Sequence, residues 1–325
     1  MEHFVFAFNA LMPLLFIALI GYFIRRWGLI GQDFINGLNM YIFYIALPIL
    51  IFSTLSGVDD LGAFNWPVIL FAIAMISIVL VVGFFFLSAI TLETRTKEVV
   101  LQAFFRGNFV IIGIPLAMRI GGEEAINVVI LLNAFMIPIS NTFSILVFRV
   151  WRSSNGFNMQ VFMRFIDATF KNPIMIGVIL GIIGLMLQDW WISLTETVVV
   201  IPDTIDFVVA SVTPMALIAV GAQFQMKRAR VFARPIAIGV IGRMIVVPAV
   251  VFTLALTVFR FIDFSGTWPA MIAVFASPIA ISSVAITKGL DGDDELAGHM
   301  VIFSTALAVF TIFILVVLFR SFGML

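Results

Sequence analysis

Long apolar runs alternate with short polar stretches along the whole chain. A helix that crosses a bilayer needs roughly 20 predominantly apolar residues, and most of these runs have about that length. The pattern therefore predicts an all-α membrane protein with ten transmembrane helices, whose ends are set only to within several residues. The predicted spans lie at about 4–24, 35–55, 66–90, 97–118, 124–148, 172–188, 202–224, 235–259, 268–288 and 295–319.

The composition agrees with a membrane protein and argues against several other classes. Of the 325 residues, 62% are hydrophobic and 11% are charged, and the mean hydropathy is +1.19. The net charge is zero, so nothing favours nucleic-acid binding, and the absence of cysteine excludes disulfides and thiolate metal sites. We expect no cofactor and no metal. The first apolar run lacks a basic n-region and a cleavage site, so it is predicted to be a retained span.

Basic residues cluster on one side of the predicted membrane. The stretches after the first, third, fifth, seventh and ninth spans hold Arg25, Arg26, Arg95, Lys97, Arg149, Arg152, Arg164, Lys171, Lys227, Arg228, Arg230, Arg234 and Lys288. The other side holds Arg119, Arg260 and Arg320. Because Lys and Arg are enriched in cytoplasmic loops, the first side is predicted to be cytoplasmic. Both termini then lie on the non-cytoplasmic side of a cell (inner) membrane.

The chain divides into two similar halves. Residues 105–108 (FRGN) and 275–278 (FASP) occupy matching places, and both GGEE at 121–124 and GDDE at 292–295 precede an apolar span. We interpret 1–150 as a first five-helix repeat and 172–325 as a second. Because five spans per repeat is an odd number, the second copy must be inverted across the membrane. Inverted repeats around a midplane site are the plan of many secondary transporters.

The connection at 151–171 separates the two repeats. Within it, residues 159–170 place apolar side chains at helical spacing beside Arg164 and Asp167. This pattern predicts a cytoplasmic amphipathic linker helix that lies at the membrane interface. A disordered linker is the alternative.

The fourth and ninth predicted spans carry residues that open a helix near their centres. Glycine tolerates an opened backbone, and proline removes a donor and clashes with the preceding turn. If both helices are broken, their half-helix N-termini can face an anion. The alternative is that these residues only kink the helices. The candidate substrate-binding residues in the two breaks are Gly107, Asn108, Pro115, Ser277, Pro278 and Ser282.

Two arginines, Arg106 and Arg243, lie deep inside apolar runs. A charge at bilayer depth normally faces a cavity or a partner, and we expect no aspartate or glutamate inside the runs to neutralise them. An anionic ligand is therefore the natural candidate, with a site-supporting role or a tie to backbone carbonyls as alternatives. Asn133 and Asn141, in the fifth span, either line the same cavity or bond across helices.

These residues also resemble a known family. Several motifs match its spans over essentially the whole chain: YIALP at 44–48, GN at 107–108 with GIPL at 113–116, KNP at 171–173, PMAL at 214–217, Arg243 with Pro248, and Pro278 with the loop at 292–295. The chain is similar to the auxin efflux carrier family, and its short connection resembles compact bacterial members that carry malonate or malate. Asn108 matches the family's crossover asparagine, whereas Ile279 departs from the polar side chain that plant carriers tend to have.

The resemblance implies a scaffold domain, a transport domain and an elevator-like movement. We therefore predict a secondary transporter for a small organic anion, a mono- or dicarboxylate, and not an enzyme. The alternatives are a sodium-coupled bile-acid-type symporter on the same fold and an anion receptor that transports nothing. Since we see no carboxylate within the spans, coupling is open between uniport, sodium and a proton. The other expected partners are membrane lipid and a second copy of the chain.

Overall fold

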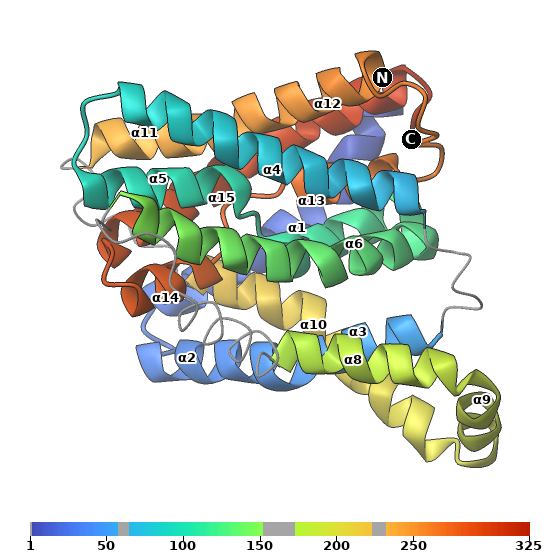
Figure 1. Ribbon diagram of the computed structural model, residues 1–325. Helices are drawn as coiled ribbons and strands as arrows, with labels where there is room; N and C mark the ends of the chain where they lie inside the picture. The colour runs from blue at the N-terminus through green and yellow to red at the C-terminus, as the bar shows by residue number, and fades with distance from the viewer. Residues whose placement is uncertain (1, 58–64, 152–172, 223–231) are drawn as a thin grey trace.

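The computed structural model describes residues 2–57, 65–151, 173–222 and 232–325. Within them every regular element is a helix (Figure 1), which confirms the predicted all-α class. The predicted linker helix at 159–170 lies outside the described residues. The elements are α1 (Glu2–Arg26), α2 (Gln32–Tyr41), η1 (Ile42–Ala46), α3 (Leu47–Ser56), α4 (Trp66–Ala89), α5 (Thr94–Phe105), η3 (Phe109–Gly113), α6 (Ile114–Val150), α8 (Pro173–Met186), α9 (Gln188–Thr197), α10 (Val200–Ala222), α11 (Ala233–Ile241), η4 (Gly242–Val246), α12 (Val247–Thr257), α13 (Trp268–Phe275), α14 (Ser282–Gly289) and α15 (Asp294–Ser321).

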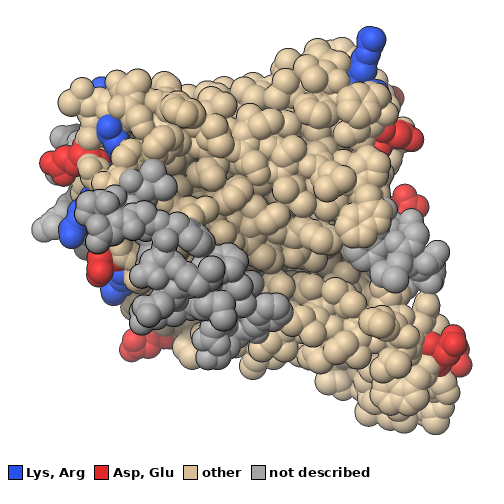
Figure 2. Space-filling model, in the orientation of Figure 1, with Lys and Arg blue, Asp and Glu red and all other residues tan. Residues whose placement is uncertain are grey.

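Seven helices in the described part of the chain are long and apolar enough to cross a membrane. The number is eight if α8 and α9, which meet at a 93° bend, form one broken span. Charged side chains gather at the two ends of the molecule, and the face between them is free of visible charge where residues are described (Figure 2). The protein is therefore a multi-pass membrane protein.

The difference between this number and the ten predicted spans has a local cause. The fourth predicted span is divided: α5 ends at Phe105, and the rest of the span continues in η3 and the start of α6. The ninth is divided into α13 and α14, which have eight residues each. Gly122, at φ 69°, turns the chain inside α6, so this element contains the end of the fourth predicted span and the whole of the fifth.

The helices pack in two groups. The scaffold group consists of α1, α2, α3, α8 and α10, with close contacts of α1 on α10 and of α3 on α8. The crossing group consists of α4, α5, α6 and the helices from α11 to α15. In Figure 1 most of the scaffold group lies as a lower layer beneath the crossing group. Each group draws helices from both halves of the sequence, so neither repeat forms a bundle of its own.

Glycines in α8 allow the contact with α3. A Cβ added at Gly177 would lie 2.6 Å from the carbonyl oxygen of Pro48, and one at Gly181 would lie 2.7 Å from Leu55 Cβ. The two glycines are four residues apart and therefore share one face of α8. In a bilayer, small residues let helix backbones approach closely and gain dispersion contacts. This contact joins the sixth predicted span to the second across the two halves of the chain.

Candidate functional site

The two broken helices meet at their breaks. Gly107 and Ile279 form an antiparallel bridge between the segment after α5 and the segment after α13. The backbone N–H of Asn108 donates to the carbonyl of Pro278 at 2.6 Å, and Ala280 N–H donates to the carbonyl of Arg106 at 3.0 Å. The structure thus brings together the two predicted breaks, which lie far apart in the sequence. We call this place the crossing.

Side chains from neighbouring elements complete the crossing. Ile279 N–H donates to Ser304 Oγ of α15 at 3.0 Å, so this buried donor has a partner outside the bridge. A Cβ at Gly107 would overlap Arg243 Nη2 and lie 2.6 Å from Ser277 Oγ. Irregular backbone at membrane depth persists only where protein groups or a cavity satisfy it. Glycine is required at 107 because two side chains occupy the space of a Cβ.

Arg243 lies in the π-helical turn η4 and is 1% exposed. Its Nε donates to the carbonyl of Ser277 at 2.9 Å, and Nη2 donates to the carbonyl of Val274 at 2.9 Å. Nη1 donates to the carbonyl of Phe104 at 3.3 Å. These carbonyls belong to the C-terminal ends of α5 and α13, where helices leave acceptors unpaired and carry partial negative charge. One guanidinium therefore joins both helix ends.

Arg106 has partners of a different kind. Nη1 donates to Asn141 Oδ1 at 2.7 Å and to Ser144 Oγ at 3.4 Å, and Nη2 donates to Ser282 Oγ at 3.1 Å. Nε is buried and has no acceptor among the described residues. All these partners are neutral side chains, so the charge of Arg106 is solvated by dipoles and is not cancelled by them.

Two buried asparagines keep unused hydrogen-bonding groups. Asn108 is 5% exposed, and its amide nitrogen has no partner in the described part of the chain. Asn133 is also buried, and neither its amide nitrogen nor its oxygen has a partner there. Because buried polar groups are nearly always hydrogen-bonded in native proteins, each amide is a place where a ligand or a water can bind.

The predicted site residues fall into three sets. Asn141 and Ser282 contact Arg106, and Ser277 contacts Arg243. Gly107, Asn108 and Pro278 form the crossing itself. Pro115 is buried in the first turn of α6, and Asn133 lies eight residues before Asn141 on the same helix, about 12 Å at 1.5 Å per residue. No hydrogen bond ties these last two to the crossing among the described residues.

A buried acid was missed from the sequence. Glu98 is fully buried in α5, so the expectation of apolar runs without a carboxylate was wrong. Its helix begins at Thr94 rather than at Lys97, which carries Glu98 inside the packed part of the molecule. Glu98, Gln102 and Arg106 are spaced by four residues and share one face. This spacing, together with the bond of Thr287 Oγ1 to Gln102 Oε1 at 2.9 Å, marks a polar stripe on α5.

Other contributors also lacked a sequence signal. Ser144 and Ser304 are fully buried and bind the crossing or Arg106. Single serines are common in membrane helices, so nothing in the sequence set these two apart. No group of three or more His, Cys, Asp or Glu in the described ranges could hold a metal ion.

Discontinuous helices that meet around a polar site are the arrangement found in many membrane transporters. The comparison with family models agrees. The model described as "Membrane transport protein", the auxin efflux carrier family, matches residues 6–316. The match covers nearly the whole chain, so the chain belongs to this family, whose members are transporters. The resemblance found in the motifs is thus confirmed. A comparison with curated proteins found no match.

Proposed function

We propose that this membrane transporter is a secondary carrier for a small organic anion, a mono- or dicarboxylate, which it moves by elevator-type alternating access. The observation that supports this most is Arg106. It is a buried cation beside the crossing, its partners are neutral, and its Nε has no acceptor among the described residues. An anion bound there would supply the counter-charge.

Glu98 does not replace that anion. It lies eight residues before Arg106 on α5, roughly 12 Å at 1.5 Å per residue. At an effective dielectric constant of about 20, opposite charges 12 Å apart attract by about 1.4 kcal/mol, against about 4 kcal/mol at 4 Å. The guanidinium therefore attracts a carboxylate in direct contact about three times as strongly as it attracts the distant glutamate.

The groups around Arg106 suit a carboxylate. Ser282 begins α14, so its neighbourhood carries the partial positive charge of a helix N-terminus. Asn108 offers an amide N–H that has no partner among the described residues, and Asn141 and Ser282 hold the guanidinium in place. Arg243 has backbone acceptors for Nε, Nη1 and Nη2, so we assign it a supporting role. Asn133 stays a candidate for a second polar contact or for a coupling ion.

The two helix groups supply the parts of an elevator. The crossing group would carry the bound anion, and the scaffold group would stay fixed in the bilayer. Each broken helix is counted here as one span. The part of α6 before Gly122 completes the fourth span, and the part after it is the fifth. This count gives ten spans in two inverted repeats. The two termini lie at the same end of the molecule (Figure 1), which supports an even number of crossings. The basic residues favour an inner membrane with both termini outside.

A ligand screen on the purified protein tests the proposal. Ligands that bind the native state raise its apparent stability, so thermal shifts are measured with mono- and dicarboxylates, with and without sodium and at two pH values. The stabilising compounds are then tested for uptake into proteoliposomes. We expect at least one carboxylate to bind and to be taken up.

A matched pair of variants connects the binding to the site. Arg106→Gln removes the buried charge, and Arg119→Gln removes an exposed one from α6. The first should abolish the carboxylate shift, and the second should leave it intact. Binding without uptake would identify an anion receptor instead of a carrier. Equal binding by both variants would remove Arg106 from the site.

A further inference from the structure

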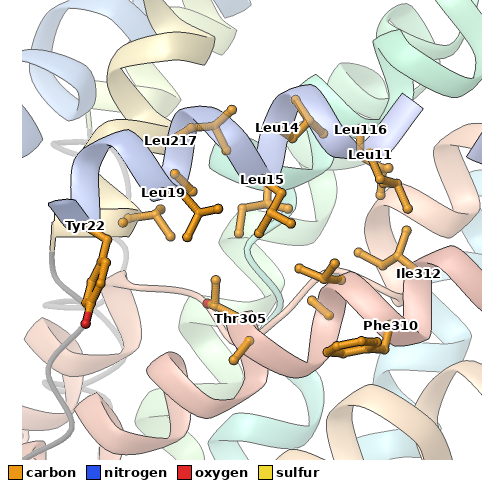
Figure 3. A pocket seen from close by; sticks show the side chains of 17 residues that line it. Leu11, Leu14, Leu15, Leu19, Tyr22, Leu116, Leu217, Thr305, Phe310 and Ile312 are labelled. Carbon is orange, nitrogen blue, oxygen red and sulfur yellow. The ribbon is translucent and has the colours of Figure 1, made fainter. Parts of the chain in front are cut away.

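A cavity of about 490 Å³ lies between the two helix groups, beside the crossing. It is bounded by α1 and α10 of the scaffold group and by η3, the start of α6, and α15 of the crossing group (Figure 3). Its size falls within the roughly 300–1,000 Å³ of ordinary ligand pockets. The side chains that point into it are mainly aliphatic, including Leu11, Leu14, Leu15, Ile112, Leu217 and Ile312.

The cavity has the length of one membrane leaflet. Along α1 it extends from Tyr22 to Leu11, which is roughly 16 Å at 1.5 Å per residue. The hydrocarbon core of a bilayer is about 30 Å thick, so one leaflet contributes about half of that. Leu19 and Phe310, which line the cavity, are 36% and 67% exposed. The rim is thus apolar and open on the face that borders the lipid.

One end of the cavity is polar and lies beside a positive charge. Tyr22 lines this end, and its hydroxyl accepts a hydrogen bond from Arg26 Nη1 at 2.8 Å. Arg26 is exposed, and no ion pair of its side chain occurs among the described residues. The next residue, Trp27, is 69% exposed, as is typical of the membrane–water interface. The apolar cavity therefore ends at Tyr22, and Arg26 contacts the tyrosine hydroxyl from outside the lining, beside a tryptophan typical of headgroup level.

We propose that this cavity binds one acyl chain of a membrane phospholipid whose anionic headgroup contacts Arg26 and Tyr22. A cavity lined mainly by aliphatic side chains offers ordered water few polar partners. A peptide cannot reach a lateral opening in the hydrocarbon region without burying unsatisfied backbone groups. The lipid chain matches the length, the lining and the opening, and its anionic headgroup matches the charge.

The bound chain would fill the space between the two helix groups. Ile112 and Leu116, which line the cavity, follow Asn108 by one and two helical turns. A lipid at this place stabilises one arrangement of the crossing group against α1 and α10. The inference does not depend on which anion is carried, because Arg106 is absent from the lining.

Native mass spectrometry of the delipidated protein measures the binding directly. Phosphatidylglycerol and phosphatidylcholine with identical acyl chains are titrated separately. A basic residue near the membrane surface adds about 1 kcal/mol toward anionic lipid, so we expect one saturable phosphatidylglycerol site with about fivefold preference over phosphatidylcholine. Equal affinity of the wild-type protein for the two lipids would overturn the assignment.

Two cavity-filling variants locate the site. Leu15→Trp fills the cavity from α1, and Ala306→Phe fills it from α15, where Ala306 is exposed and a larger side chain is tolerated. Both should lose the tightly bound lipid. Ile20→Trp is the matched control, since Ile20 is 53% exposed and lies outside the lining. Retention of the site in either monodisperse filling variant would contradict the proposal.

Variants of Arg26 and a competition experiment with the transported carboxylate complete the test. Arg26→Gln should lower the affinity for phosphatidylglycerol to that for phosphatidylcholine. Arg26→Lys keeps the charge and should keep most of the difference between the two affinities. If a transported carboxylate displaces the bound phosphatidylglycerol competitively, the cavity belongs to the cargo path and the lipid assignment fails. If no carboxylate is transported but the lipid site is found, only the proposed function fails.

Discussion

Arg106 and Arg243 are both buried arginines at the same crossing, yet they are held in different ways. Arg243 donates from Nε, Nη1 and Nη2 to three backbone carbonyls that end α5 and α13. Arg106 donates to side chains, an amide and two hydroxyls, and keeps Nε without a partner among the described residues. Carbonyls at helix ends are fixed by the fold, whereas side-chain partners can turn toward a ligand.

This difference separates a structural cation from a binding cation. The helix ends that surround Arg243 carry partial negative charge that stabilises it without any ligand. Arg106 has dipoles but, in the described part of the chain, no opposite charge in contact. Both side chains are buried, so the nature of the acceptors is what distinguishes them. The following predictions test that distinction.

Arg243→Gln should have the largest effect, and it should act on folding. The substitution removes a charged donor and leaves buried carbonyls without a partner, which costs about 3–5 kcal/mol when a buried charged network is broken. We expect a large fall in thermal stability and in the yield of monodisperse protein, measured by thermal melting and size-exclusion chromatography. A stable variant that loses only anion binding would instead make Arg243 a ligand of the substrate.

Arg106→Gln should leave the fold intact and abolish transport. Truncating one member of a buried charge pair costs at least about 2 kcal/mol, which corresponds to roughly a 30-fold weaker anion binding. Arg106→Lys keeps the charge and should restore part of the binding. Isothermal titration with the transported carboxylate measures both. If Arg106→Gln lowered thermal stability as much as Arg243→Gln, Arg106 would also be a structural residue and the proposed difference between the two arginines would be wrong.

Gly107→Ala should behave like a weak version of the Arg243 variant. The added Cβ overlaps Arg243 Nη2, and overpacking a dense interior costs about 1–3 kcal/mol. Thermal stability should fall while the affinity of the remaining folded protein for the carboxylate changes little. Gly122→Ala, at the φ 69° turn of α6, is a comparison outside the crossing, because its added Cβ meets no neighbour and only the backbone is strained.

Asn108→Ala should have the smallest effect on stability and a clear effect on uptake. Its amide nitrogen has no protein partner in the described part of the chain, so removing it leaves no buried group unpaired. Losing one hydrogen bond to a bound anion costs about 1.5 kcal/mol or more, and uptake into proteoliposomes should fall at least tenfold. Near-normal uptake would show that the amide does not face the cargo.

The sequence predicted the places of the two breaks, and both arginines that it singled out are buried in the structure. Glycine, asparagine and proline at the centres of otherwise apolar runs are local signals, because each weakens or kinks a helix. They do not always open it, since Pro13, Pro138 and Pro214 lie inside α1, α6 and α10. The burial of Glu98 was missed because the start of α5 differed by three residues from the predicted span. Helix ends are the least certain part of such a prediction, and one helical turn decides whether a carboxylate lies in water or in the core.

The sequence by itself determined the class of the protein, its apolar helices, its family and the residues that interrupt two of its helices. These properties follow from local composition and spacing. Only the tertiary structure decided which cation is satisfied and which is not. Phe104, Val274 and Ser277 present backbone carbonyls to Arg243, and a carbonyl is the same chemical group in every residue. Its position is therefore set by the packing of α5 and α13 around η4, which no local pattern encodes.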